Sequence, residues 1–276
     1  MPKIAVVYLD RWGNPPRFPR AFLNSLKDNP AGSDYDLIWQ LKGYPESGQS
    51  PLLAEFSQYH RGLIHQERYP DDLYQFSLAF DVARRFEHDF FVFFISWSRI
   101  LAPNWLRFYL TAFERHADCG VVSATGSFEC LTRDQTFPNR HIRTNAFMIE
   151  RKLFLSLEPG DLTAKKAGNQ FEAGNNGLTR QIERRGLAPM LVDRFGNALR
   201  ADAWPRSRVY RSGAQEALLV ADNRTHDYAV GSVKRRRKLV RLAWGEGAPV
   251  EPASLGERLR AGVRWRWPAI GDQFGM

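Results

Sequence analysis

The sequence predicts an α/β fold with a mostly parallel central sheet flanked by helices. Short apolar runs alternate with amphipathic segments through the first two thirds of the chain, as in sheets whose strands are joined by helices. Residues 90–95 are apolar at every position, which is typical of a strand buried on both faces. Polar residues follow this run at once, where α/β sheets form their ligand crevice.

The first strand and helix units are predicted from composition and turn signals. Residues 4–9 form a β-branched apolar run and predict the first strand. A short helix is expected at residues 21–27. Residues 36–40 predict the second strand, and residues 52–60 a helix that leads toward the third strand.

The centre of the chain continues this alternation. We expect the third strand at residues 61–65 and a helix from Pro70 to about residue 86, with Asp71 or Asp72 as its N-cap or dipole partner. The fourth strand is the apolar run 90–95. An amphipathic helix follows over residues 103–116.

The last predicted elements are three strands and one helix. Strands are expected at residues 119–124, 145–149 and 190–192. A helix over residues 176–185 would end at Gly186, because glycine commonly terminates helices. After about Tyr210 the alternation weakens, so we expect one domain over residues 1–212 and a basic, aromatic helical extension over residues 213–276, packed on or beside it.

Composition restricts the class of protein. The chain has 276 residues, 43% of them hydrophobic, enough to bury a substantial core. Only two cysteines, Cys119 and Cys130, are present, which excludes a disulfide scaffold and favours a reducing compartment. The N-terminus lacks the features of a signal peptide. The sequence contains no run of about 18 apolar residues, so no membrane-spanning helix is predicted. We therefore expect a cytoplasmic protein.

Several familiar motifs are missing from the sequence. It contains no GxGxxG turn after the first strand, no GxxxxGK[ST] loop, no HExxH helix and no GxSxG elbow. Dinucleotide-dependent dehydrogenases, P-loop NTPases, zincins and α/β-hydrolases are therefore disfavoured.

The order of the remaining segments resembles the GT-A fold glycosyltransferases of the large family-2 type. The matching pieces follow the aromatic strand: Arg-Ile-Leu-Ala-Pro-Asn-Trp-Leu at 99–106, Gly-Val-Val-Ser-Ala-Thr-Gly at 120–126 and Phe-Glu-Ala-Gly at 171–174. The resemblance covers roughly residues 3–193. It implies a Rossmann-related, GT-A-like fold and a hexosyltransferase type of enzyme. Such an enzyme moves sugar from a nucleotide diphosphate donor to a glycan or lipid-linked acceptor, with inversion.

The sequence departs from this family where the family usually carries Asp-x-Asp. The aligned residues are Ser96, Trp97 and Ser98, and hydroxyls are poor primary ligands for the Mg²⁺ or Mn²⁺ that the resemblance implies. Ser96 and Ser98 would line the diphosphate region, or they satisfy backbone groups at the strand end. A literal Asp-x-Asp at 34–36 precedes its strand and would mark a strand boundary instead.

Two acidic residues are candidates for nucleoside binding. Asp10 follows the first strand, and Asp72 follows the third. In the resembled family, an acid near this third strand and helix contacts the base or ribose. The alternatives are a solvated loop for Asp10 and helix capping for Asp72.

The resemblance also supplies catalytic candidates. Glu172 matches the region of the general base, with Asp161 as second choice; the alternative for Glu172 is a partner for a helix dipole. Arg143 and His141 would compensate for the missing Asp-x-Asp by holding phosphate, or lie in a solvated loop. His226 is a weak metal-ligand candidate, with a surface or capping role as the alternative.

The C-terminal region carries most of the net charge of +9. Residues 231–276 hold ten Lys or Arg and four Asp or Glu, a net charge of +6, so residues 1–230 carry +3. Residues 234–244 predict a basic helix, and residues 264–267 read Arg-Trp-Arg-Trp. The tail would contact an anionic membrane or, less favoured, nucleic acid. The slightly preferred alternative is a helix packed on the domain through Leu239, Leu242 and Trp244.

These observations leave two functions open. The first is the glycosyltransferase described above. The second is a catalytically degenerate GT-A-like domain that binds nucleotide, glycan or a protein partner without turnover, as the Ser96 and Ser98 departure suggests.

Overall fold

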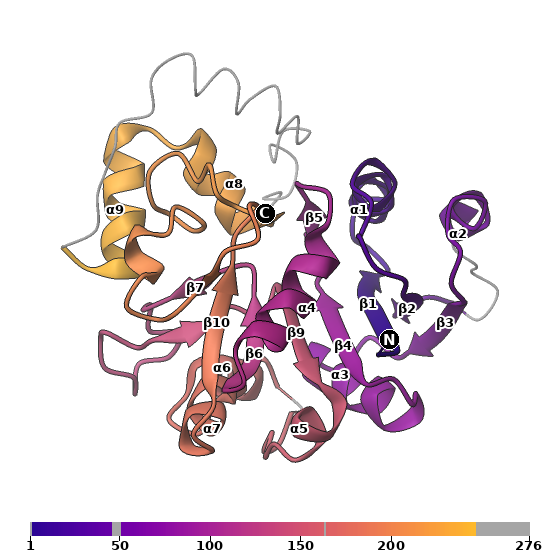
Figure 1. The fold of residues 1–276 in the computed structure, drawn as a ribbon, viewed down its shortest axis with the longest axis horizontal. Helices are drawn as coiled ribbons and strands as arrows, with labels where there is room; N and C mark the ends of the chain where they lie inside the picture. Colours follow the sequence, from indigo (N-terminus) through magenta and orange to yellow (C-terminus); the bar gives the residue numbers. More distant parts are fainter. Residues whose placement is uncertain (1, 46–50, 163, 247–276) are drawn as a thin grey trace.

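The computed structural model describes residues 2–45, 51–162 and 164–246 and contains one large sheet flanked by helices (Figure 1). The strand order is β11-β10-β6-β9-β4-β1-β2-β3. Its strands are β1 (Ile4–Arg11), β2 (Asp36–Lys42), β3 (Ile64–Tyr69), β4 (Phe90–Phe94), β6 (Cys119–Ser123), β9 (Ala146–Glu150), β10 (Ala188–Val192) and β11 (Ala198–Leu199).

Most pairs in this sheet are parallel. β1 pairs in parallel with β2 and β4, β2 with β3, and β6 with β10. β9 runs antiparallel between β4 and β6, and β11 antiparallel to β10. The prediction of a mostly parallel α/β sheet is confirmed.

Helices cover both faces of the sheet. On one face, Val6 and Tyr8 share a core with Phe22 of α1 and Trp105 of α4. On the other face, alternate strand residues pack against α3, α5 and the C-terminal helices. The helices are α1 (Arg17–Asp28), α2 (Pro51–Phe56), α3 (Gln75–Arg85), α4 (Trp105–Arg115), α5 (Arg151–Leu155), α6 (Lys165–Ala173), α7 (Leu178–Arg184), α8 (Asn223–Val230), α9 (Val233–Trp244) and the 3₁₀ turn η1 (Trp204–Arg206).

Some predicted boundaries are wrong. β3 begins at Ile64 rather than residue 61, and α3 begins at Gln75 with Tyr74 as an N-cap that makes no side-chain hydrogen bond. Asp71 and Asp72 therefore do not cap this helix, because they lie in the turn before it. Gly186 does follow α7, with the positive φ of +75° that suits glycine.

The chain beyond Tyr210 is more regular than the sequence indicated. Two short antiparallel pairs, β5 (Arg99–Ile100) with β12 (Val220–Ala221) and β7 (Gly126–Ser127) with β8 (His141–Ile142), flank the main sheet. α8 and α9 follow β12 (Figure 1), and Tyr228 of α8 and Leu239 of α9 belong to the hydrophobic core of the domain.

The packing of α9 agrees only in part with expectation. Leu239 and Trp244 are buried in the domain core, but Leu242 is 46% exposed. The Arg-Trp-Arg-Trp stretch at 264–267 lies outside the described residues. Among the helices that the structure describes, none is both long and apolar enough to cross a bilayer.

Candidate functional site

A small pocket with a mostly apolar lining lies at the carboxyl ends of β1 and β4. β2 and β3 extend the sheet on one side of β1 and β4 lies on the other, so this is the point where strand order reverses and α/β proteins form ligand crevices. The lining includes Leu9 from β1, Ile95 after β4, Gln75 at the start of α3 and Thr144 before β9. The sequence predicted a crevice at this edge.

Glu172 lies beside this pocket. From the end of α6, its Oε2 accepts a hydrogen bond of 2.9 Å from Thr144 Oγ1, and its Oε1 accepts one of 3.4 Å from the Thr144 amide. Burial and then the nearby Glu172 carboxylate raise the pKa of Tyr74. The second base candidate, Asp161, is exposed in the loop before α6. The predicted base region thus contributes one carboxylate that is held at the pocket.

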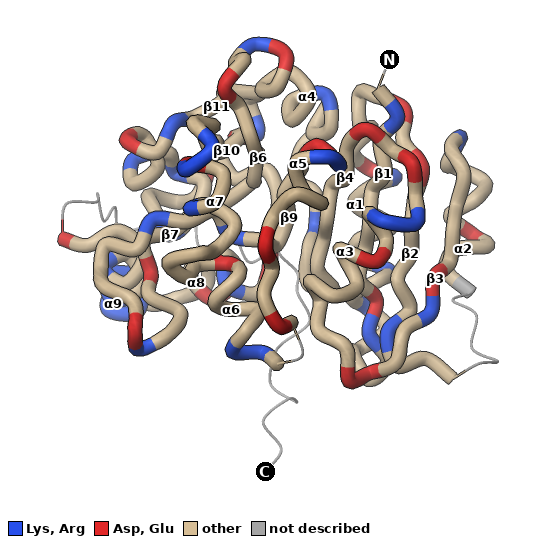
Figure 2. Tube along the Cα trace, turned by 90° about the horizontal axis from the view of Figure 1, so that it is seen from below, with Lys and Arg blue, Asp and Glu red and all other residues tan. Residues whose placement is uncertain are grey.

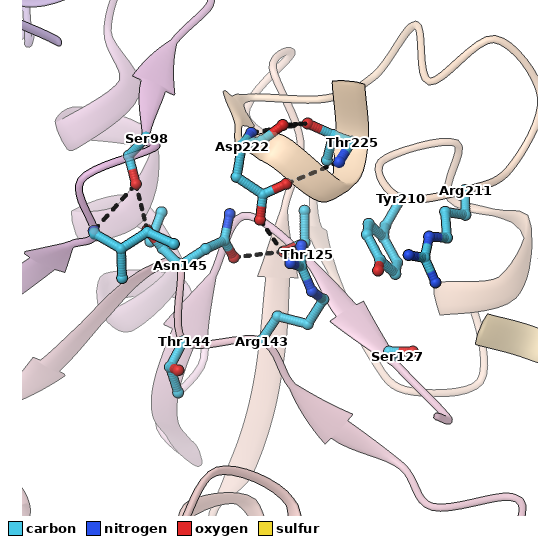
Figure 3. A network of polar contacts seen from close by, with 12 residues as sticks. Ser98, Thr125, Ser127, Arg143, Thr144, Asn145, Tyr210, Arg211, Asp222 and Thr225 are labelled. Atoms are coloured by element: carbon cyan, nitrogen blue, oxygen red, sulfur yellow. Dashed lines mark hydrogen bonds and ion pairs between the residues drawn. The ribbon is translucent and has the colours of Figure 1, made fainter. Parts of the chain in front are cut away.

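The two serines after β4 connect backbone segments. Ser96 Oγ donates to the Leu9 carbonyl oxygen at 2.6 Å, and Ser98 Oγ donates to that of Asn145 at 2.7 Å (Figure 3 shows Ser98). Ser98 Oγ also accepts from the Ile95 amide at 3.2 Å. These contacts agree with the alternative role expected for Ser96 and Ser98, in which their hydroxyls form hydrogen bonds with backbone groups at the end of the strand.

A divalent cation does not fit this serine pair. Both side chains are nearly fully buried, both protons are directed to carbonyl oxygens, and neither position offers a carboxylate. Among the described residues, the structure holds no group of three or more His, Cys, Asp or Glu side chains arranged to bind a metal.

Asp10 is an interior residue of β1 rather than part of a solvated loop. Its Oδ2 accepts a hydrogen bond of 3.0 Å from Trp39 Nε1, and its side chain also bonds to Tyr44. Burial raises the pKa of Asp10, while these two hydrogen bonds oppose the shift. Asp10 therefore holds Tyr44 in place just after the carboxyl end of β2.

A charged cluster at the ends of β1, β2 and β3 was not predicted from the sequence. Arg11 forms a two-bond ion pair with Asp71, both bonds 2.8 Å, and Lys42 Nζ lies 3.8 Å from Asp71. Burial lowers the pKa of Lys42. The Asp71 carboxylate opposes this shift, the Arg11 charge lowers the pKa further, and the Asp72 carboxylate opposes it to a smaller extent. Asp72 is exposed beside this cluster. The feature of the sequence that could have revealed this cluster is that Arg11 and Lys42 each stand at the end of a strand.

Two features next to this cluster shape its surface. A Cβ built on Gly43, whose φ is +71°, would lie 2.9 Å from the Asp71 Cβ, so glycine lets Asp71 approach the strand end. The rings of Trp12 and Tyr44 meet edge-on at 5.1 Å, and Trp12 is 56% exposed. An aromatic surface is therefore open to solvent beside the charges.

Arg143 lies in a polar network rather than in a solvated loop: its side chain is 12% exposed, and its partners Thr125 and Asp222 are fully buried (Figure 3). Its Nη2 is 2.6 Å from the Asp222 carboxylate, its Nη1 donates to Thr125 Oγ1 at 3.2 Å, and its guanidinium lies 4.3 Å from the centre of the Tyr210 ring. Burial lowers the pKa of Arg143, but the Asp222 carboxylate outweighs it and the net shift is upward.

A second buried ion pair lies on the other side of Tyr210. Arg211 Nη1 is 2.6 Å from Glu129 Oε1, and the Arg211 guanidinium lies 4.9 Å from the same ring. Tyr210 thus separates two guanidinium groups, each matched by its own carboxylate.

The two histidine candidates are interior residues. His141 is 1% exposed, and its Nδ1 lies 2.8 Å from the Asn139 carbonyl oxygen; burial lowers its pKa, and the Glu172 carboxylate opposes that shift. His226, in α8, is 8% exposed, and burial followed by the Arg99 charge lowers its pKa. His141 and Arg143 are both close enough to Glu172 to be affected by its charge, but His141 is buried and Arg143 is largely buried.

The comparisons with known proteins add little to this geometry. No family model matches the sequence, and no curated protein is significantly similar to it. HddC from Yersinia pseudotuberculosis is 12% identical with a TM-score of 0.39, over 58% of this chain and 81% of that one. The CMP:2-keto-3-deoxy-manno-octonic acid synthetase complexed with CTP is 11% identical with a TM-score of 0.39, over 69% and 90%.

Similarities this weak assign neither substrate nor activity. The strand order and pairing of the chain define an α/β protein with a mostly parallel sheet. Its candidate site is the pocket at the reversal of strand order, with the charged cluster beside it.

Proposed function

We propose that this chain binds a nucleotide diphosphate sugar at the carboxyl edge of its sheet and transfers the sugar, with inversion, to an acceptor hydroxyl. The observation that carries this proposal is the Glu172 carboxylate, which Thr144 holds beside the pocket between β1 and β4. Ligand crevices form at such reversals of strand order, and inverting transfer needs a positioned base.

Glu172 acts as the base in this proposal. Its carboxylate takes the proton of the acceptor hydroxyl while the acceptor oxygen bonds to the anomeric carbon. The bond between that carbon and the diphosphate oxygen breaks, and its electron pair leaves with the nucleotide. Thr144 orients the carboxylate.

Cations from the strand ends receive the diphosphate in this proposal. Arg11 is half exposed and Lys42 lies beside it, and Arg pairs bidentately with phosphate oxygens. The open Trp12 ring offers a stacking surface for the base, and Asp72 contacts the nucleoside. Arg143 and His141 are given no phosphate contact because their side chains are engaged in the interior.

The test combines calorimetry with a transfer assay on a panel of uridine, guanosine and cytidine diphosphate sugars. Glu172→Gln is expected to lower turnover by a factor on the order of 10² to 10⁴ while donor binding is kept. Glu158→Gln, an exposed carboxylate in the loop between α5 and α6, is the matched control and keeps full turnover. Full activity of Glu172→Gln, with loss in Asp161→Asn, would transfer the role to Asp161.

A second function is a domain that binds a nucleotide sugar without turnover. The engagement of Ser96 and Ser98 with backbone carbonyls favours it, because no carboxylate replaces the missing Asp-x-Asp there. Binding of a donor with neither transfer nor donor hydrolysis would support this second function over the first.

A further inference from the structure

α9 carries a basic stripe that the proposed function does not use. Lys234, Arg237, Lys238 and Arg241 are exposed and lie at i, i+3, i+4 and i+7, so they share one face of the helix. The Lys and Arg positions of α9 are visible as blue segments in Figure 2. Arg241 is near Glu246, at 3.2 Å, but both side chains are more than half exposed, so this pair leaves the charge accessible.

The other two cations of the run have structural partners. Arg236 is 3% exposed and donates to the carbonyl oxygens of Tyr228 and Ala229, at 3.1 and 2.6 Å, at the end of α8. Arg235 pairs with Asp227 at 2.8 Å. The stripe therefore excludes these two and consists of the four cations named above.

Apolar side chains border this stripe. Val230, Val233 and Leu242 are 50%, 37% and 46% exposed. The opposite face of α9 packs into the domain through Leu239, Val240 and Ala243, so the helix is anchored to the protein and presents its basic face outward.

We propose that this stripe docks the protein on an anionic bilayer surface. Basic residues near such a surface are attracted to its acidic headgroups, and the bordering aliphatic side chains enter the interface. Nucleic acid is a poorer match because the one aromatic residue of α9, Trp244, is 5% exposed and its indole N–H donates to the Tyr210 carbonyl oxygen, so α9 itself presents no ring among its cations for base stacking.

Vesicle co-sedimentation of the full chain tests this proposal. Binding is expected to phosphatidylcholine vesicles with about 30% phosphatidylglycerol and to weaken strongly as salt rises, and it is not expected with phosphatidylcholine alone. The triple variant K234E/R237E/K238E should lose roughly 100-fold or more in affinity. Leu242→Ser should lose a smaller factor.

The matched control is R61E/R115E/K152E, which makes the same charge change at exposed positions away from α9 and should bind vesicles like the wild type. Equal binding of both triple variants would overturn the proposal, as would tighter binding of a single-stranded oligonucleotide than of the vesicles. Circular dichroism confirms that the variants are folded. Donor binding by the K234E/R237E/K238E variant is measured in parallel, so failure of docking and failure of the proposed function are distinguished.

Discussion

Arg143 and Asp222 form a largely buried ion pair that joins the segment before β9 to the N-cap of α8. The Asp222 side chain is fully buried and also accepts from the Thr225 amide at 2.8 Å in a capping box (Figure 3). One carboxylate thus both caps a helix and neutralises a buried cation.

Asp222→Asn tests the weight of this pair. The amide can still cap α8, but it leaves the Arg143 charge buried without its counter-charge, which costs about 3–5 kcal/mol when a buried pair is broken. We expect the free energy of unfolding in urea to fall by an amount of this size. Asp118→Asn, at the exposed pair with Arg200, should cause little change; equal losses in the two variants would contradict the argument.

Arg236→Ala removes the side chain that bonds the last carbonyls of α8. A hydrogen bond from a charged donor contributes about 1.5–3 kcal/mol, so we expect a loss of about 2–3 kcal/mol in the free energy of unfolding. The neighbouring Arg235→Ala removes an exposed cation and should leave the urea midpoint nearly unchanged. If Arg235→Ala were the more damaging substitution, the burial assigned to these two positions would be wrong.

The pH dependence of stability should reveal Asp10. Its folded pKa is raised, mainly by burial, so its contribution to stability is full below the unfolded pKa and is lost as pH rises through the folded pKa. Asp10→Asn cannot ionise, so its stability relative to the wild type should improve as pH rises above about 4, the unfolded pKa of an aspartate.

Asp36 provides a control of opposite sign. Burial opposes the shift, but hydrogen bonds from His88 and from the Leu63 amide lower its pKa overall. Its contribution is present above the unfolded pKa and lost as pH falls through the folded pKa. The stability of Asp36→Asn relative to the wild type should therefore improve toward low pH, as denaturant titrations across pH would measure; a common direction for both variants would refute these assignments.

Thr144→Val tests the positioning of Glu172. Valine keeps the volume but loses the hydroxyl that donates to the carboxylate. Misplacement of the base should lower kcat by roughly 10- to 100-fold with little change in KM. Thr144→Ser should recover most of the rate, whereas a rise in KM alone would mean that Thr144 contacts substrate instead.

Turnover is expected to be insensitive to EDTA. The serine hydroxyls at the family's metal position donate to carbonyl oxygens, and cations of the strand ends would neutralise the diphosphate. The measurement is the transfer rate before and after chelation. A complete block that Mn²⁺ reverses would refute the metal-free form of the proposed function.

The sheet was predictable because its strands are short apolar runs. The aromatic run at β4 gave the centre of the fold, and the literal Asp-x-Asp at 34–36 was correctly interpreted as a strand boundary, since Asp36 opens β2 and bonds Leu63 and His88. The antiparallel direction of β9 could not be predicted from the sequence, because the direction of a strand depends on neighbouring strands that are distant in sequence.

The site was less predictable for a related reason. Glu172 was proposed as the base through family resemblance. Its hydrogen-bond partner Thr144 is 28 residues away in sequence, and no local pattern distinguishes it from other loop threonines. Arg143 was expected to hold phosphate or, as the alternative, to lie in a solvated loop. Its position in the structure depends on Asp222, which is 79 residues away in sequence and approaches Arg143 only in the folded chain. Local patterns do not encode such long-range charge pairing.

The two ion pairs on either side of Tyr210 also affect the cooperativity of unfolding. Detaching the segment after β11 would separate Arg143 from Asp222 and Arg211 from Glu129, stranding charges that the protein interior solvates poorly. The C-terminal helices should therefore melt together with the sheet, and calorimetry should record a single cooperative transition.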